Sequence, residues 1–260
     1  VVSFGQVIQQ EAAVPYDDRG SQNSGIMTIP AKTGGDIIWQ TTFDWANPED
    51  PRGWTLPAGW EIRDNSDLGN VWIWAVDSLN DGYGLIPTPS FFGSKDDGFI
   101  HMPIRAYNQR DGVSTASPAD SYIQTENIDC SASSSVVVRF TQQFRLCCSN
   151  YNLEMLVSSD LGVHWASYDV RFGVAGNLTP PERFRTVEIN VSDVAAGSPN
   201  VQIRFYMYGM NNYYWAIDDL ALVEAYDHDL VLEDTWMEFD GGSGATIDQI
   251  NYWPLSQMGM

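Results

Sequence analysis

The chain has 260 residues, of which 43% are apolar and 13% aromatic, so it can bury a large core and is not a disordered protein. Its 34 acidic groups outnumber its 13 basic groups. The resulting net charge of −21 argues against binding to nucleic acid or to an anionic membrane surface, because both require a basic patch. No stretch of 18 apolar residues occurs, so no membrane insertion is expected.

The composition also indicates the fold class. With 22 glycines, 13 prolines and no long helical periodicity, the sequence favours an all-β fold with many turns. The acidic excess has two interpretations: it keeps the protein soluble, or part of it holds Ca²⁺ in a compartment where calcium is abundant.

The first elements follow from composition and alternation. Residues 1–35 are polar and are interpreted as an N-terminal arm or leader, and residues 36–44 form the first convincing strand. Residues 45–74 are predicted to be a long loop without regular helix, because prolines and glycines interrupt it. Its tryptophans, Trp45 and Trp54 among them, either pack over one end of the fold or face a ligand. Burial is the commoner role of such large rings.

Alternating patterns recur further along the chain. Residues 111–121 are expected to be a soluble loop. Short strands separated by turns predict a two-sheet antiparallel jelly-roll sandwich over residues 36–225. One face of segment 135–146 carries Val136, Val138, Phe140, Gln142 and Phe144. The other predicted strands are residues 98–104, 151–159, 165–172, 186–191, 200–208 and 213–222.

After Glu224 the pattern changes. Residues 227–239 form a new strand pattern, and a glycine-rich loop follows it. Residues 226–260 are therefore expected to be a linker and the first strands of a second β module of Ig-like type.

The segment SSDLGVHW, residues 158–165, fits Ser-x-Asp-x-Gly-x-x-Trp. The spacing predicts a hairpin turn in which Asp160 accepts turn N–H groups, Gly162 supplies a positive φ and Trp165 packs beneath. It resembles the Asp-box turn of sialidases and many secreted β proteins, although His164 stands where that motif usually has Thr. The expected role is structural and implies no sialidase activity.

Three cysteines are present, Cys130, Cys147 and Cys148. An odd number leaves one thiol free or paired with another chain. The sequence leaves Cys130–Cys147, Cys130–Cys148 and a vicinal Cys147–Cys148 bond open. We expect one disulfide from Cys130, at the start of a strand, to the pair near the end of that strand. An oxidising extracellular setting would permit it.

The stretch YYWAIDDLAL, residues 213–222, is a strand pattern with two aspartates at its centre. A carboxylate buried in a sheet is costly without a partner, and no lysine or arginine is nearby in sequence. One solution is that Asp218 caps backbone amides at a bulge. The other is a structural Ca²⁺ shared with the first strand, since the first and last strands of a jelly roll are often neighbours. The predicted metal ligands are Asp218, Asp44, Asp219 and Asp97, with Asp64, Asp67, Asn70 and Asp96 as further candidates.

Catalytic patterns are absent from the sequence. It has no GxSxG, HExxH or CxxC motif and no phosphate-binding glycine loop. Its three histidines, His101, His164 and His228, suggest no triad. A glycosidase needs only two carboxylates, so a total of 34 acids is not diagnostic. We expect a protein that is not an enzyme.

Several of these segments together resemble a family. The runs WQTTFDW, GWTLPAGWEI, GNVWIW, VVVRFTQQFRL, SSDLGVHW, VQIRFYMYG and YYWAIDDLAL resemble the MAM-like jelly-roll domains of secreted Bacteroidota proteins, which include the cleaved-adhesin and choice-of-anchor groups. The likeness covers residues 36–225. The tail looks like the modules that follow such domains in type IX-secreted surface proteins. The resemblance implies a secreted or cell-surface binding role, often with structural calcium, and its usual calcium ligand maps to Asp218.

Three functions are compatible with these features. The first is a non-catalytic extracellular adhesion module that binds a glycan or a surface protein. The second is a carbohydrate-binding accessory module of a secreted hydrolase, with exposed aromatic rings stacking on sugars. The third is a structural subunit of a surface filament or layer, which contacts other copies of itself or other modules of the same polypeptide. The aromatic residues expected to bind sugar are Trp54, Tyr213, Tyr214 and Trp45, together with Tyr83.

Overall fold

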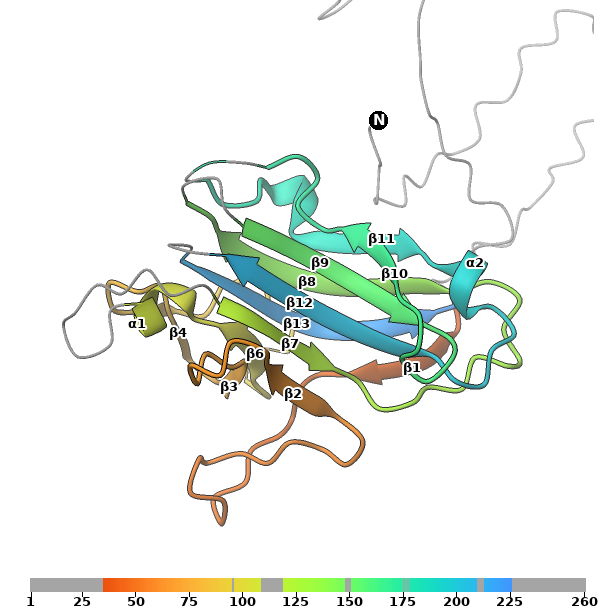
Figure 1. Cartoon of the computed structure of the whole chain (residues 1–260), viewed down its shortest axis with the longest axis horizontal. Coiled ribbons are helices and arrows are strands. Elements are labelled where there is room, and N and C mark those ends of the chain that lie inside the picture. The colour runs from red at the N-terminus through yellow and green to blue at the C-terminus, as the bar shows by residue number, and fades with distance from the viewer. Residues whose placement is uncertain are drawn as a thin grey trace, which may run out of the picture. The chain divides into compact units, whose positions relative to one another are not determined.

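The computed structural model describes residues 35–94, 96–108, 119–147, 151–174, 176, 178–209 and 213–225. Within these residues the protein is almost entirely β, and its two main sheets are antiparallel and stack as a sandwich, as predicted (Figure 1). Most of the predicted N-terminal arm and the whole predicted module at 226–260 lie outside the described residues, so both stay predictions. No helix in the described ranges has the length and apolarity to cross a membrane.

The larger sheet has six strands in the order β11-β8-β13-β6-β3, and β1 also pairs with β13. The pairing of β1 with β13 confirms that the first predicted strand and the last described one are neighbours, with Thr41 opposite Leu220. The strands are β1 (Ile37–Thr41), β3 (Ile73–Ala75), β6 (Phe99–Met102), β8 (Val137–Arg145), β11 (Thr186–Asn190) and β13 (Tyr214–Val223).

The smaller sheet has five strands in the order β10-β9-β12-β7-β2. They are β2 (Glu61–Asp64), β7 (Ala119–Gln124), β9 (Tyr151–Ser158), β10 (Ala166–Asp169) and β12 (Gln202–Gly209). A separate two-stranded hairpin consists of β4 (Ser78–Asn80) and β5 (Leu85–Pro87). The short helices are α1 (Ile104–Asn108), the 3₁₀ turn η2 (Glu182–Phe184) and α2 (Ser192–Ala195).

The core lies between the two main sheets and follows the predicted alternation. Every second side chain of β8 and β12 is buried, because successive residues of a strand point to opposite faces. The set predicted for segment 135–146 is buried, including the polar Gln142. Inside the core the Gln142 amide donates to Val170 O at 2.8 Å and to Phe184 O at 3.1 Å, while its Oε1 accepts from Trp215 Nε1 at 3.1 Å.

The tryptophans of the long aromatic segment pack against one another. Trp45 and Trp54 are only 7% and 6% exposed, and the rings of Trp45 and Trp60 meet edge to face with centroids 4.8 Å apart. The interpretation of these rings as core is therefore correct.

Two loop predictions were wrong. Segment 45–74 contains β2 and the start of β3, and segment 111–121 overlaps the start of β7. The β2 sequence EIRD has a single apolar residue, so it shows no alternation, and among the described strands it pairs with β7 alone. The inward residues at the start of β7, Ala119 and Ser121, are small and give almost no apolar signal.

The disulfide prediction also needs correction. Cys130 is a buried free thiol, so neither bond that begins at Cys130 is present. Burial raises its pKa to about 11, which keeps the thiol protonated and unreactive at neutral pH. Cys147 is itself disulfide-bonded, which agrees with the vicinal alternative and not with a bond to Cys130; Cys148 lies outside the described residues.

Candidate functional site

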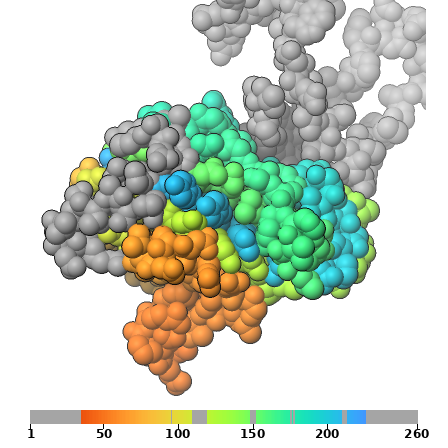
Figure 2. All heavy atoms as spheres, viewed as in Figure 1, coloured from red at the N-terminus to blue at the C-terminus, as the bar shows by residue number. Residues whose placement is uncertain are grey.

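The outward side of the five-stranded sheet is the candidate site. In β12 the alternation that sends Ile203, Phe205 and Met207 into the core turns the residues between them toward solvent. In Figure 1 this sheet lies in front of β8 and β13. Figure 2, in the same view, shows the blue atoms of β12 as a diagonal band between the yellow-green β7 and the green β9. We name this surface the tyrosine face; it consists of Tyr122, Gln124, Asn152, Glu154, Arg204, Tyr206 and Tyr208.

Strand register places the aromatic rings of this face side by side. Tyr206 lies opposite Tyr122 on β7 and opposite Glu154 on β9. Tyr208 follows on the same side of β12, opposite Asp120, and is 36% exposed. Side chains directly opposite each other in an antiparallel pair have Cβ atoms about 4.5–5.5 Å apart. The register therefore places the three tyrosines next to one another on the outward side of β7 and β12.

Arg204 borders these rings and is held on both sides. Its guanidinium carbon lies 3.8 Å from the ring centroid of Tyr122 and 4.0 Å from that of Trp165. Two of its nitrogens donate to Gln124 Oε1, Nε at 3.1 Å and Nη2 at 2.6 Å. Cation–π contact and hydrogen bonding together fix this side chain in a planar stack.

The hydroxyl groups of Tyr122 and Tyr206 form hydrogen bonds with carboxylates. Tyr122 Oη donates to Glu61 Oε1 at 3.0 Å. Burial raises the pKa of Tyr206 to about 12, and a hydrogen bond to Asp120 adds to that effect. Burial also raises the pKa of Tyr122, although Arg204 opposes the shift. Both phenols are therefore neutral at physiological pH and present intact aromatic rings.

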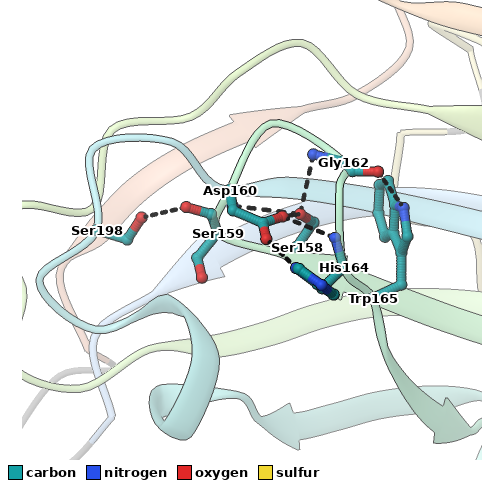
Figure 3. A network of polar contacts seen from close by, with 7 residues as sticks. All are labelled: Ser158, Ser159, Asp160, Gly162, His164, Trp165 and Ser198. Carbon is teal, nitrogen blue, oxygen red and sulfur yellow. Dashed lines mark hydrogen bonds and ion pairs between the residues drawn. The ribbon is translucent and has the colours of Figure 1, made fainter.

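The predicted Asp-box turn, shown in Figure 3, ends in Trp165, which contacts Arg204 of this surface. Asp160 Oδ1 accepts from the backbone N–H of His164 at 2.9 Å, and Gly162 has a φ of +82°. Trp165 Nε1 donates to Gly162 O at 2.9 Å. His164 Nδ1 pairs with Asp160 Oδ2 at 2.6 Å, so the histidine that replaces the usual threonine still contacts the motif's aspartate. The structural role predicted for the turn is confirmed, and the turn also positions the ring that stacks on Arg204.

A second polar centre lies on the other sheet, where β13 bulges. The register of β13 against β8 shifts between Asp218 and Ala221, and Asp219 has a φ of +53°. Asp218 Oδ1 accepts the backbone N–H of Asp219 at 2.8 Å, which is the bulge cap anticipated from the sequence. Ser94 Oγ lies 2.9 Å from Asp218 Oδ1 and 2.5 Å from Asp219 Oδ1, so one hydroxyl joins the two carboxylates.

Burial and charge leave Asp218 incompletely satisfied. Its side chain is fully buried, and no described residue forms a hydrogen bond with its Oδ2. Burial and the neighbouring Asp219 raise its pKa to about 7. The carboxylate of Asp219 accepts a hydrogen bond from Gly93 N, which lies 2.8 Å from Oδ2. A Cβ at Gly93 would lie 2.8 Å from that oxygen, so a larger residue there would require the Asp219 carboxylate to shift.

The remaining predicted metal ligands do not join this pair. Asp44 and Asp97 are exposed. Across the described part of the chain, no three His, Cys, Asp or Glu side chains come together as a metal-binding group. The predicted set of four carboxylates is therefore not formed, and Asp218 and Asp219 remain with Ser94, Gly93 N and Thr141, whose Oγ1 donates to Asp218 O at 3.1 Å.

The aromatic residues predicted to bind sugar are mostly inaccessible. Trp45 and Trp54 belong to the core, and Tyr213 and Tyr214 are 5% and 3% exposed. Tyr83 alone among them is open, at 66%, and it stacks with Arg105, whose guanidinium carbon lies 4.0 Å from the ring centroid. The prediction of exposed stacking platforms was wrong for the four buried residues, because their rings complete two apolar clusters.

The tyrosine face was missed from the sequence, although part of its signal was present. The alternation of 200–208 identified the inward residues, and the same pattern places Arg204, Tyr206 and Tyr208 outward. What the pattern does not contain is the identity of the neighbouring strands.

No protein-family model matches the chain, and no curated protein matches it. Among solved structures, it is similar to the K1 cleaved adhesin domain of Lys-gingipain from Porphyromonas gingivalis, at 14% identity and a TM-score of 0.42, over 66% of this chain and 94% of that one. The K3 cleaved adhesin domain of Lys-gingipain is similar at 15% identity and 0.41, over 74% and 100%. A family 11 carbohydrate-binding module from Clostridium thermocellum, solved with a β-1,3-1,4-mixed-linked tetrasaccharide, is similar at 12% identity and 0.36, over 75% and 99%.

Proposed function

We propose that the protein is a non-catalytic extracellular binding module that holds a glycan on the tyrosine face. The observation that carries this proposal is the adjacency of Tyr122, Tyr206 and Tyr208 on the outward side of one sheet. Tyrosine rings offer large contact area with little loss of side-chain entropy, and the apolar faces of sugar rings stack on them. The amides and carboxylates beside them, such as Asn152 and Asp120, can bind sugar hydroxyls.

The test compares two tyrosines on a glycan array, followed by calorimetry on any glycan that binds. Tyr206→Ala is expected to lower the affinity at least tenfold, because it removes the central ring of the face. Tyr83→Ala is the matched control, since Tyr83 is exposed but lies at the β4–β5 hairpin. If Tyr83→Ala abolished binding while Tyr206→Ala did not, the site would be the hairpin and the proposal would be wrong.

We also propose that Ca²⁺ stabilises the fold at the β13 bulge. Two adjacent carboxylates, a fully buried Oδ2 without a partner and no ion pair with another described residue all fit a hard cation that prefers oxygen ligands. Asp218 and Asp219 would hold the ion, and its charge would offset the cost of burying Asp218 in ionised form.

Thermal unfolding with calcium and with a chelator tests this second proposal. Calcium is expected to raise the Tm of the unmodified protein and to have little effect on Asp218→Asn. Asp97→Asn is the control, because Asp97 is exposed and is not grouped with Asp218 and Asp219. An equal Tm in calcium and chelator for the unmodified protein would refute the calcium site.

A secreted or cell-surface setting, reached by type IX export, belongs to the proposed function. It is supported by the sequence resemblance to Bacteroidota surface proteins and by the acidic surface, and its direct test is detection of the protein outside intact cells.

A further inference from the structure

We infer that the glycan held on the tyrosine face carries protonated amino groups, and that Glu154 is the residue that selects them. The inference rests on the proposed glycan binding and concerns the charge class of the ligand. It starts from an imbalance on the outward side of the five-stranded sheet: the carboxylates of Glu61, Asp120, Glu154 and Asp169 outnumber the guanidinium groups of Arg63 and Arg204, and Arg204 is already engaged.

Glu154 is the least satisfied of these carboxylates. It lies on β9 between Tyr206 of β12 and Asp169 of β10. Its side chain is half-buried, and its charge contributes to the raised pKa of Tyr206, but among the described residues it has no hydrogen-bond or ion-pair partner. Asp169, by contrast, pairs with Arg171, with its Oδ1 3.1 Å from Nε. A carboxylate that has no partner in the protein keeps its acceptor oxygens available, so a cationic ligand group at this position would be favourable.

The arginines of the sheet are held away from Glu154. Arg204 is stacked between two rings and bound to Gln124 of β7, the strand on the far side of β12 from Glu154. Arg63 lies on β2, opposite Tyr122 and therefore on the opposite edge of the sheet. Neither arginine neutralises Glu154, and Arg204 has no open face for a ligand carboxylate.

The pair Tyr206–Glu154 has the chemistry of an ammonium site. The face of a tyrosine ring attracts a cation, and the adjacent carboxylate accepts its charge-assisted hydrogen bonds. Uronate or sulfated polymers would meet Glu154, Asp120 and a net charge of −21, all of which repel them. Amino-sugar polymers, such as oligomers of glucosamine, combine stackable rings with ammonium groups and match both properties.

The test uses three β-1,4-linked hexasaccharides, of glucosamine, N-acetylglucosamine and glucose, measured by calorimetry at about pH 5.5 and low salt. The unmodified protein is expected to bind the glucosamine oligomer at least about tenfold more tightly than the glucose oligomer. Glu154→Gln is expected to remove that preference. Glu182→Gln, which removes the same charge from an exposed position at η2, is expected to keep it.

The outcomes separate the inference from the proposed function. If the preference survives in Glu154→Gln, or falls equally in both variants, the selection is not made by Glu154 and the inference is wrong. If neutral oligomers bind as tightly as the glucosamine oligomer, the inference fails while glycan binding stands. If no oligomer binds and a broad glycan array is also blank, the proposed function itself fails.

Discussion

Arg204 on β12 and Trp165 at the end of the Asp-box turn are stacked, with the guanidinium carbon 4.0 Å from the ring centroid. The contact joins the turn between β9 and β10 to the centre of the tyrosine face. Because the other side of the guanidinium covers Tyr122, the position of that ring depends on a turn in a distant part of the sequence. A motif with a structural role thus supports the candidate binding surface.

The stack predicts that Arg204→Lys destabilises the protein by about 1–2 kcal/mol, because lysine has neither the planar group that stacks nor the fork that binds Gln124. Urea unfolding measures the loss, and a double-mutant cycle with Trp165→Leu isolates the contact. Arg63→Lys, at an exposed position of the same sheet, is the control and should change stability little. A coupling energy near zero would show that the stack contributes nothing.

Gly162 is expected to tolerate alanine less well than Gly173. Both have positive φ, +82° and +75°, so each substitution strains the backbone by about 1 kcal/mol. A Cβ at Gly162 would also lie 3.2 Å from the Trp165 ring, whereas nothing lies within 4 Å at Gly173. Thermal unfolding should therefore show a larger loss of Tm for Gly162→Ala. Equal losses would contradict the tight fit under the tryptophan.

Gln142→Leu is expected to destabilise the fold by roughly 2–4 kcal/mol, since it removes the partner of Trp215 Nε1, of the buried Val170 O and of the partly buried Phe184 O. Chemical denaturation checks the value. Gln143→Leu, on the opposite face of β8 and only half-buried, should cost less. If the two variants were equally stable, the buried amide would be dispensable.

His101 makes the protein sensitive to acid. It is fully buried, neither ring nitrogen has a hydrogen-bond partner among the residues that the structure describes, and burial lowers its pKa to about 3. Between pH 6.5 and 3 the unfolded chain binds a proton that the folded chain does not, so this residue's contribution to stability falls as pH falls, by roughly 3 kcal/mol at pH 4.

The measurement is the difference in unfolding free energy between pH 7 and pH 4, compared for the unmodified protein and His101→Leu. The variant should lose less stability on acidification, whatever its stability at pH 7. The same loss in both proteins would show that His101 does not resist protonation in the folded state.

The sequence by itself determined the local properties. Alternation with a period of two identified β8, β9 and β12 and their buried faces, because it depends only on how neighbouring residues point. The Asp-box turn could also be predicted from the sequence, since its hydrogen bonds join residues within eight positions. The sequence also identified the aspartate pair on β13 as unusual for a buried strand, and the alternative of a capped bulge described its backbone correctly.

Strand order and loop placement were decided only by the tertiary structure. Tyr122 adjoins Tyr206 because β12 pairs between β7 and β9, and no local pattern encodes which distant strands will share hydrogen bonds. Ser94 reaches both carboxylates of the bulge because its loop folds over β13, while Asp44 and Asp97 remain exposed. Pairing and packing between segments far apart in sequence therefore created the tyrosine face and brought Ser94 to the two carboxylates. The direction of the side chains along each strand, by contrast, follows from the order of residues within that strand.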